Sequence, residues 1–226
     1  MTLTEMGRRA KDVSRVLNTL GSREKNMGLE EAARALLDSE EEILTGNRED
    51  YERAEAGGMS QGLLDRLKLT PARIQAMADG LLQVAALDDP VGEVLSMKLR
   101  PNGLQIGQKR VPLGVIGMIY EARPNVTADA FGLCFKSGNA VILKGGSDAL
   151  QSNKAIVQAL RTGLLRAGLP EESLQLIEDA SRDTTKELMR LNRYIDVLIP
   201  RGGAGLIKTV VENSTIPVIE TGTGNC

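Results

Sequence analysis

Apolar residues in the first 88 positions recur every three or four residues, the spacing of one face of an α-helix. The run from Leu3 to Leu20 predicts one amphipathic helix, and Gly21-Ser22 is expected to end it and to cap the next. The second helix is expected to start at Ser22 and to continue to residue 56, with a break near Gly46. We interpret these apolar faces as core packing rather than as part of a cofactor site.

Two further signals delimit helices in this part of the chain. Gly57-Gly58 is typical of a helix end, and Thr70-Pro71 of a helix start, because threonine caps the first turn and proline suits the first helical position. Residues 1–89 are therefore predicted to form a helical segment that packs on the rest of the chain.

The pattern changes at residues 90–112. Two short strands are predicted there, joined at Pro101-Asn102-Gly103, where Asn-Gly suits a turn with positive φ. We expect a protruding β-hairpin.

From residue 113 onward, short β-branched runs alternate with helical patterns. Strands are predicted at 113–120, 139–143, about 174–177, 195–199 and 216–219, with helices at roughly 126–137, 147–167, 181–191 and 203–212. Such alternation predicts an α/β fold with a doubly wound, mostly parallel sheet over residues 113–226.

Polar residues follow two of these predicted strands. Arg123 and Asn125 come after the first strand, and Lys144 closes the second. Ligands of open α/β sheets bind beyond the carboxyl ends of the strands, so these residues mark a candidate site. The residues alone leave alternatives open: Asn125 could cap the following helix, Lys144 could be an ordinary strand end, and Arg123 could pair with Glu121.

A glycine turn follows the strand predicted at 195–199. Gly202 and Gly203, preceded by Arg201, would let backbone N–H groups approach an anion at the start of the next helix. The turn does not fit the G-x-G-x-x-G pattern, because the third glycine position holds Lys208. By itself the turn is more often simple topology than a cofactor site.

Composition narrows the chemistry. A net charge of −2 and only three Tyr and two Phe without Trp argue against a nucleic-acid-binding protein. The absence of histidine excludes Ser–His–Asp and Cys–His mechanisms and histidine-bearing zinc sites within this chain, and no metal site is predicted. Two cysteines do not make a disulfide framework, and no run has the length of a membrane span, so we expect a cytoplasmic chain without a membrane partner.

Six sequence runs together resemble a known family. They are SREKN (22–26), LTPARI (69–74), RVPLGVIGMIYEARPNVT (110–127), GNAVILKGG (138–146), LIPRGGAGLIK (198–208) and STIPVIETGTGNC (214–226). In this order they resemble the aldehyde dehydrogenase superfamily, and most closely its glutamate-5-semialdehyde dehydrogenase (gamma-glutamyl phosphate reductase) branch.

The resemblance implies an enzyme that reduces L-glutamyl 5-phosphate, an acidic acyl phosphate, to glutamate 5-semialdehyde with NADPH in proline synthesis. It implies a homo-oligomer in which the hairpin at 90–112 takes part in association. In that family the nucleophilic cysteine and the catalytic domain follow the segment matched here, so the chain as given is expected to be an inactive N-terminal part.

The same resemblance assigns roles to individual residues. Asn125 matches the side-chain donor of the oxyanion hole, and Lys144 matches the lysine that contacts the adenosine ribose, where its charge would favour NADP over NAD. Gly202, Gly203 and Arg201 match the turn that holds the cofactor pyrophosphate, so the resemblance implies a dinucleotide-binding domain over residues 113–226. Arg123 is expected to bind the phosphate or a carboxylate of the substrate.

Two residues near the end of the chain need separate treatment. Glu220 falls where other aldehyde dehydrogenases carry a general base, which makes it a catalytic candidate. Cys226 is not at the position of the family's nucleophile, and Cys134 lies on the apolar face of a predicted helix, where we expect core packing. The alternatives to a reductase are a non-catalytic nucleotide-binding or assembly module, and an aldehyde dehydrogenase for another aldehyde.

Overall fold

The computed structural model describes residues 1–121 and 123–220. Before the hairpin, the chain forms α1 (Leu3–Leu17), α2 (Ser22–Asp38), α3 (Glu40–Ala56), α4 (Gln61–Leu67) and α5 (Pro71–Ala86). After the hairpin follow β3 (Val115–Tyr120), α6 (Asn125–Lys136), β4 (Ala140–Lys144), the 3₁₀ turn η1 (Ser147–Ala149), α7 (Leu150–Arg166), the 3₁₀ turn η2 (Glu171–Ser173), β5 (Leu174–Leu176), α8 (Arg182–Leu188), β6 (Val197–Arg201) and α9 (Ala204–Asn213).

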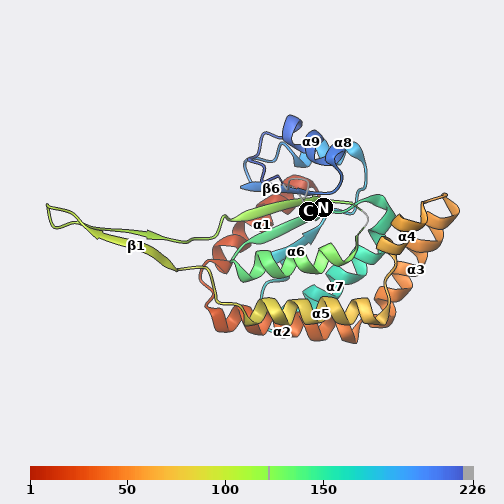
Figure 1. The fold of residues 1–226 in the computed structure, drawn as a ribbon, viewed down its shortest axis with the longest axis horizontal. Helices are drawn as coiled ribbons and strands as arrows, with labels where there is room; N and C mark the ends of the chain where they lie inside the picture. Colours follow the sequence, from red (N-terminus) through yellow and green to blue (C-terminus); the bar gives the residue numbers. More distant parts are fainter. Residues whose placement is uncertain (122, 221–226) are drawn as a thin grey trace.

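A parallel four-stranded sheet with the order β5-β4-β3-β6 forms the centre of the molecule (Figure 1). Ile116 of β3 pairs with Val141 of β4 on one side and with Val197 of β6 on the other. Strands β3 and β4 are buried along their whole length, as expected of continuous apolar runs in a parallel sheet. The predicted α/β fold with a parallel sheet is therefore confirmed.

Helices α1, α2, α3 and α5 share one hydrophobic core with the sheet, whereas the buried residues of α4 belong to a separate small cluster. Helix α1 packs against β3, β4 and β5, and α6 packs against β3 and β4. Helices α2 and α5 lie side by side and cover α6 and α7 from below in the view of Figure 1. The division of the chain into three parts stays a prediction.

A buried polar junction joins α3 to the start of α7. The carboxylate of Asp50, 0% exposed, accepts hydrogen bonds from the backbone N–H of Gln151 (3.2 Å), and from both the backbone N–H and the hydroxyl of Ser152 (2.7 Å each). These are N–H groups in the first turn of α7, which have no partner within their own helix. Arg53 adds an ion pair to the same carboxylate.

Three local predictions need correction. The predicted second helix is broken at Ser39, between α2 and α3, and not near Gly46. Gly46 lies within α3 against the backbone of α7, where a Cβ would lie 3.0 Å from the carbonyl oxygen of Gln151. The cap of α2 is Gly21, whose N–H is bound by Glu24, and not Ser22. Residues 216–219 form no strand, since only Val218 makes an isolated bridge, to Leu198.

The hairpin of β1 (Val94–Leu99) and β2 (Gln105–Lys109) is present as predicted and reaches away from the body of the molecule (Figure 1). Gly103 in its turn has φ of +85°, the conformation that the Asn-Gly pair predicts. Every residue of both strands is exposed, apolar ones such as Leu99 and Ile106 included. Among the described residues, none of the helices combines the length and the hydropathy needed to span a bilayer.

Candidate functional site

A hollow of about 920 Å³ lies at the carboxyl ends of β3, β4 and β6, and is called here the main hollow. It gathers five of the residues that the sequence singled out, namely Arg123, Asn125, Arg201, Gly202 and Gly203. The remaining lining residues are Met59, Leu63, Arg66, Glu121, Val126, Asp129, Gly146, Ser147 and Asp148. The chain therefore places its candidate residues where ligands of open α/β sheets bind.

A second hollow of about 350 Å³, the side hollow, lies between α4, α5 and the start of α6. Four residues line both hollows: Arg66, Arg123, Asn125 and Asp129. The two hollows therefore meet at these four side chains.

Asn125 is the first residue of α6, and the residue at the cap position is Pro124, so the capping alternative for Asn125 is wrong. Its amide donates a hydrogen bond to the Asp129 carboxylate at 3.3 Å, one turn along the helix. Both side chains keep exposed surface, and both line the two hollows. The amide is thus accessible to a ligand.

A buried network of side-chain hydrogen bonds holds together the elements on which Asn125 sits. The hydroxyls of Tyr120 and Thr127 lie 2.7 Å apart, and Thr127 donates to the side-chain oxygen of Asn153 at 2.9 Å. Burial raises the pKa of Tyr120 far above its usual range, so the phenol stays protonated. The network ties the end of β3 to α6 and α7, the elements that flank Asn125.

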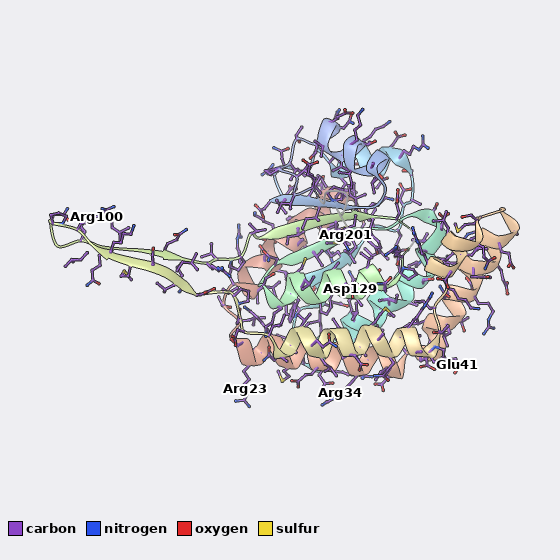
Figure 2. All side chains as sticks on the ribbon, viewed as in Figure 1. Arg23, Arg34, Glu41, Arg100, Asp129 and Arg201 are labelled. Carbon is purple, nitrogen blue, oxygen red and sulfur yellow. The ribbon has the colours of Figure 1, made fainter. Side chains whose placement is uncertain are left out.

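Asp129 sits in an unusual electrostatic setting. Desolvation raises the pKa of its carboxyl group, while the Asn125 hydrogen bond and the charge of Arg201 oppose that rise. Figure 2 shows Asp129 on α6 and Arg201 at the end of β6, both near the middle of the view.

The start of α9 already holds an anion from the chain itself. A carboxylate oxygen of Glu121 accepts a hydrogen bond from the N–H of Gly203 at 2.9 Å, and Gly203 is the residue before the first turn of α9. A Cβ on Gly202 would lie 2.7 Å from the same carboxyl group. The absence of a side chain at Gly202 leaves room for the Glu121 carboxylate, and an anionic oxygen fits this helix start.

Glu121 therefore does not pair with Arg123. The Arg123 guanidinium makes no hydrogen bond or ion pair to any other residue that the structure describes. The alternative of a structural ion pair between these neighbours is wrong.

Lys144 ends β4, but it lines neither hollow. Its side chain is 4% exposed, and its ammonium donates to the carbonyl oxygen of Gly145 at 3.2 Å. Desolvation lowers its pKa, and the charge of Asp179 partly offsets this effect. The role expected for Lys144 stays a prediction.

Two other candidates lie apart from the hollows. Glu220 is exposed and lines neither of them, and Cys226 lies outside the described residues. Cys134 is buried in the core, where desolvation raises its pKa to about 12, so its thiol is inert at neutral pH.

The sequence did not point to Arg66 or Asp129. Arg66 reaches the site from α4, 49 positions before the start of β3, and no local pattern marks it. Asp129 follows Asn125 at the spacing of one helical turn, a signal that could have identified it as a neighbour of that amide.

Comparisons with known proteins were made for the whole chain. No protein-family model matches it. A curated gamma-glutamyl phosphate reductase from Clostridium botulinum (strain Eklund 17B / Type B) is 60% identical over 220 residues, which are 97% of this chain and 53% of that protein. The chain thus spans about half the length of the curated relatives that it matches.

Solved structures agree with this likeness. The crystal structure of gamma-glutamyl phosphate reductase from Thermotoga maritima superposes with a TM-score of 0.95 at 46% identity, covering 98% of this chain and 54% of that one. A probable aldehyde dehydrogenase from Listeria monocytogenes superposes with a TM-score of 0.72 at 15% identity, covering 97% of this chain and 45% of that one, which shows a shared fold alone.

Proposed function

Because this chain belongs to the gamma-glutamyl phosphate reductase family, we propose that it supplies the cofactor-binding and oxyanion-stabilising residues of an enzyme that reduces L-glutamyl 5-phosphate to glutamate 5-semialdehyde in proline synthesis. One observation carries the proposal. The main hollow brings an accessible amide, Asn125, together with an anion-binding helix start at Gly203.

In the proposed reaction, a thiolate attacks the acyl carbon and phosphate leaves, which gives a thioester. The nicotinamide cofactor, when bound, would supply the hydride that reduces this thioester, and the thiolate would leave as the aldehyde forms. Negative charge develops on the carbonyl oxygen in both steps, and the Asn125 amide would donate a hydrogen bond to it. Neither Cys134, which is buried, nor any other described side chain serves as the thiolate in this proposal.

The start of α9 fits a cofactor phosphate. Glu121 shows that the Gly203 N–H can hold an anionic oxygen, and the helix dipole favours negative charge at this place. Gly202 keeps the approach free of a side chain, and Arg201 adds a positive charge beside it. These residues would bind the pyrophosphate of the cofactor.

The choice of NADP over NAD rests on Lys144. Its ammonium would bind the 2′-phosphate of the adenosine ribose, which requires the buried side chain to turn toward solvent. A titration with both reduced cofactors tests this part, and equal affinities for NADH and NADPH would contradict it.

The test of the oxyanion role is Asn125→Ala in the complete enzyme. The loss of one such donor lowers kcat by about 10² to 10³, with little change in cofactor affinity. Asn192→Ala, a change at an exposed asparagine away from both hollows, is the matched control. A normal kcat in the Asn125 variant would exclude the role.

The hairpin supports a further part of the proposal, association into a homo-oligomer. Its exposed apolar side chains, Leu95, Met97, Leu99, Leu104 and Ile106, gain from burial against another subunit. A non-catalytic module or an enzyme for a different aldehyde is less well supported, because the similar proteins at 60% and 46% identity are gamma-glutamyl phosphate reductases, whereas the aldehyde dehydrogenase shares only the fold at 15% identity.

A further inference from the structure

Two arginines from distant parts of the chain meet at the junction of the hollows. Arg66 belongs to α4 and Arg123 follows β3, yet both line the main hollow and the side hollow. Asn125, the proposed oxyanion donor, lines the same two spaces. The side chains of these three residues therefore border one common volume.

The backbone that carries Arg66 is held firmly. The buried side chain of Asn47 donates to the carbonyl oxygen of Leu67 at 2.9 Å and accepts from the N–H of Leu69 at 2.7 Å. Leu64 and Leu67 of α4 are buried in a small apolar cluster with Ala54 and Ala149. A short helix fixed in this way presents its arginine at a defined position.

Three acidic side chains that line the hollows pair with groups other than these two arginines. Asp65 pairs with Arg73 at 3.1 Å, and Arg73 also donates to two backbone carbonyls in the same turn. Asp129 accepts from Asn125, and Glu121 accepts from Gly203. The remaining cation of the side hollow, Lys68, lies 5.8 Å from the ring centre of Tyr51.

In contrast, neither Arg66 nor Arg123 makes a side-chain hydrogen bond or an ion pair within residues 1–121 and 123–220. The two guanidinium groups thus border a space that Asp129 also lines, but neither of them is paired with an acid among the described residues. Such a pair matches the charge of a phosphate group, roughly −1.5 to −2 at pH 7, and the guanidinium fork matches its oxygens.

We propose that Arg66 and Arg123 form a clamp for the phosphate of the acyl phosphate, an inference that rests on the proposed function. The phosphate of such a substrate is attached to the carbon whose oxygen Asn125 would stabilise. A group that shares its space with Asn125 is therefore placed for the phosphate, whereas the α-carboxylate of the substrate lies several bonds away. Arg66 is the residue that this clamp adds to the site.

The test measures the binding of inorganic phosphate to the chain of 226 residues, by the shift of its thermal unfolding midpoint and by calorimetric titration. Potassium chloride at equal ionic strength gives the reference. We expect phosphate to raise the midpoint of the unchanged chain, and Arg66→Ala and Arg123→Ala each to weaken its binding about tenfold or more, the effect of losing charge-assisted hydrogen bonds. Arg66→Lys, which keeps the charge but not the fork, should bind with intermediate affinity.

Arg23→Ala is the matched control, because Arg23 is an exposed arginine on α2, far from Asp129 in Figure 2. Unfolding without phosphate shows whether each variant is folded. The proposal is overturned if phosphate acts no more strongly than chloride, or if Arg66→Ala binds phosphate as well as the unchanged chain. It is also overturned if L-glutamate, and not phosphate, shows the dependence on Arg66, because the clamp would then hold a carboxylate.

The failure of this inference is distinguishable from that of the proposed function. If the complete enzyme reduces the acyl phosphate, but Arg66→Ala changes neither phosphate binding nor the KM of the substrate, only the inference of the clamp is wrong. If phosphate binding depends on both arginines but the complete enzyme has no reductase activity, the proposed function is wrong and the arginines still form a phosphate site.

Discussion

Two carboxylates each accept hydrogen bonds at the start of a helix, at the carboxyl edge of the same sheet. They differ in their exposure to solvent and in the number of hydrogen bonds that they accept. Asp50 is fully buried at the start of α7, and it accepts from two backbone N–H groups and a hydroxyl, with Arg53 beside it. Glu121 is exposed at the start of α9 and accepts from one N–H group.

This difference distinguishes a helix start that only stabilises the fold from one that a ligand can reach. The start of α7 is closed, since its N–H groups are satisfied by a side chain that water and ligands do not reach. The start of α9 is open, because a ligand phosphate can take over the single hydrogen bond that Glu121 makes. A helix start is therefore available to a ligand when the anion that occupies it is exposed and weakly held.

The largest expected effect comes from removing the buried carboxylate. Asp50→Ala leaves two N–H groups and the Ser152 hydroxyl without an acceptor, which lowers the free energy of unfolding by about 3 kcal/mol. Urea unfolding measures the loss. Glu49→Ala, an exposed neighbour in α3, should change stability by less than about 0.5 kcal/mol. A loss equal to that of the control would show that the junction is not structural.

Lys144 combines features of both carboxylates. It is buried, as Asp50 is, but its side chain makes one hydrogen bond, as that of Glu121 does. Burial lowers its pKa below the ordinary value of 10.5, so the unfolded chain binds the proton more tightly than the folded one. Its contribution to stability therefore rises as the pH rises from the lowered pKa toward 10.5.

Lys144→Met removes this buried charge. We expect it to raise the free energy of unfolding at pH 7 by about 1 kcal/mol, and the gain to shrink as the pH approaches 10.5. Unfolding in urea at both pH values measures it. A Met variant less stable than the unchanged chain at pH 7 would show that the ammonium stabilises the fold.

The smallest effect concerns the exposed carboxylate. Glu121→Gln removes the negative charge that competes for the start of α9, so cofactor affinity should increase about two- to fivefold. Unfolding should change little, in contrast to Asp50→Ala. Asp148→Asn, another exposed acid of the main hollow, serves as the control for a general change of charge. Weaker cofactor binding in the Glu121 variant would mean that the carboxylate assists the ligand.

The sequence predicted the elements whose signals are local. Thr70 does cap α5, where it accepts from the N–H of Arg73, and Pro71 does occupy the first turn. The β-branched runs of β3 and β4 give a buried parallel pair. Gly46 misled the prediction, because glycine there serves the close approach of α7 and not a break in the helix.

The site was predictable only in part, for the same reason. Asn125, Arg123 and the glycine turn could be placed together because they all follow strands of one parallel sheet. The hydrogen bond between Glu121 and Gly203 joins residues 82 positions apart, and Arg66 lines the hollows together with Arg123, which lies 57 positions later. Such contacts are set by tertiary packing, which no local pattern encodes.

The hairpin of β1 and β2 has a consequence for the exchange of amide hydrogens with solvent. Its backbone hydrogen bonds join only the two strands to each other, and all their side chains are exposed. Its amides can therefore exchange through opening of the hairpin alone, while those of β3 and β4 require a much larger opening of the buried sheet. The hairpin is thus a separate unit of local unfolding, and slower exchange along it at higher protein concentration would test the proposed association of subunits through the hairpin.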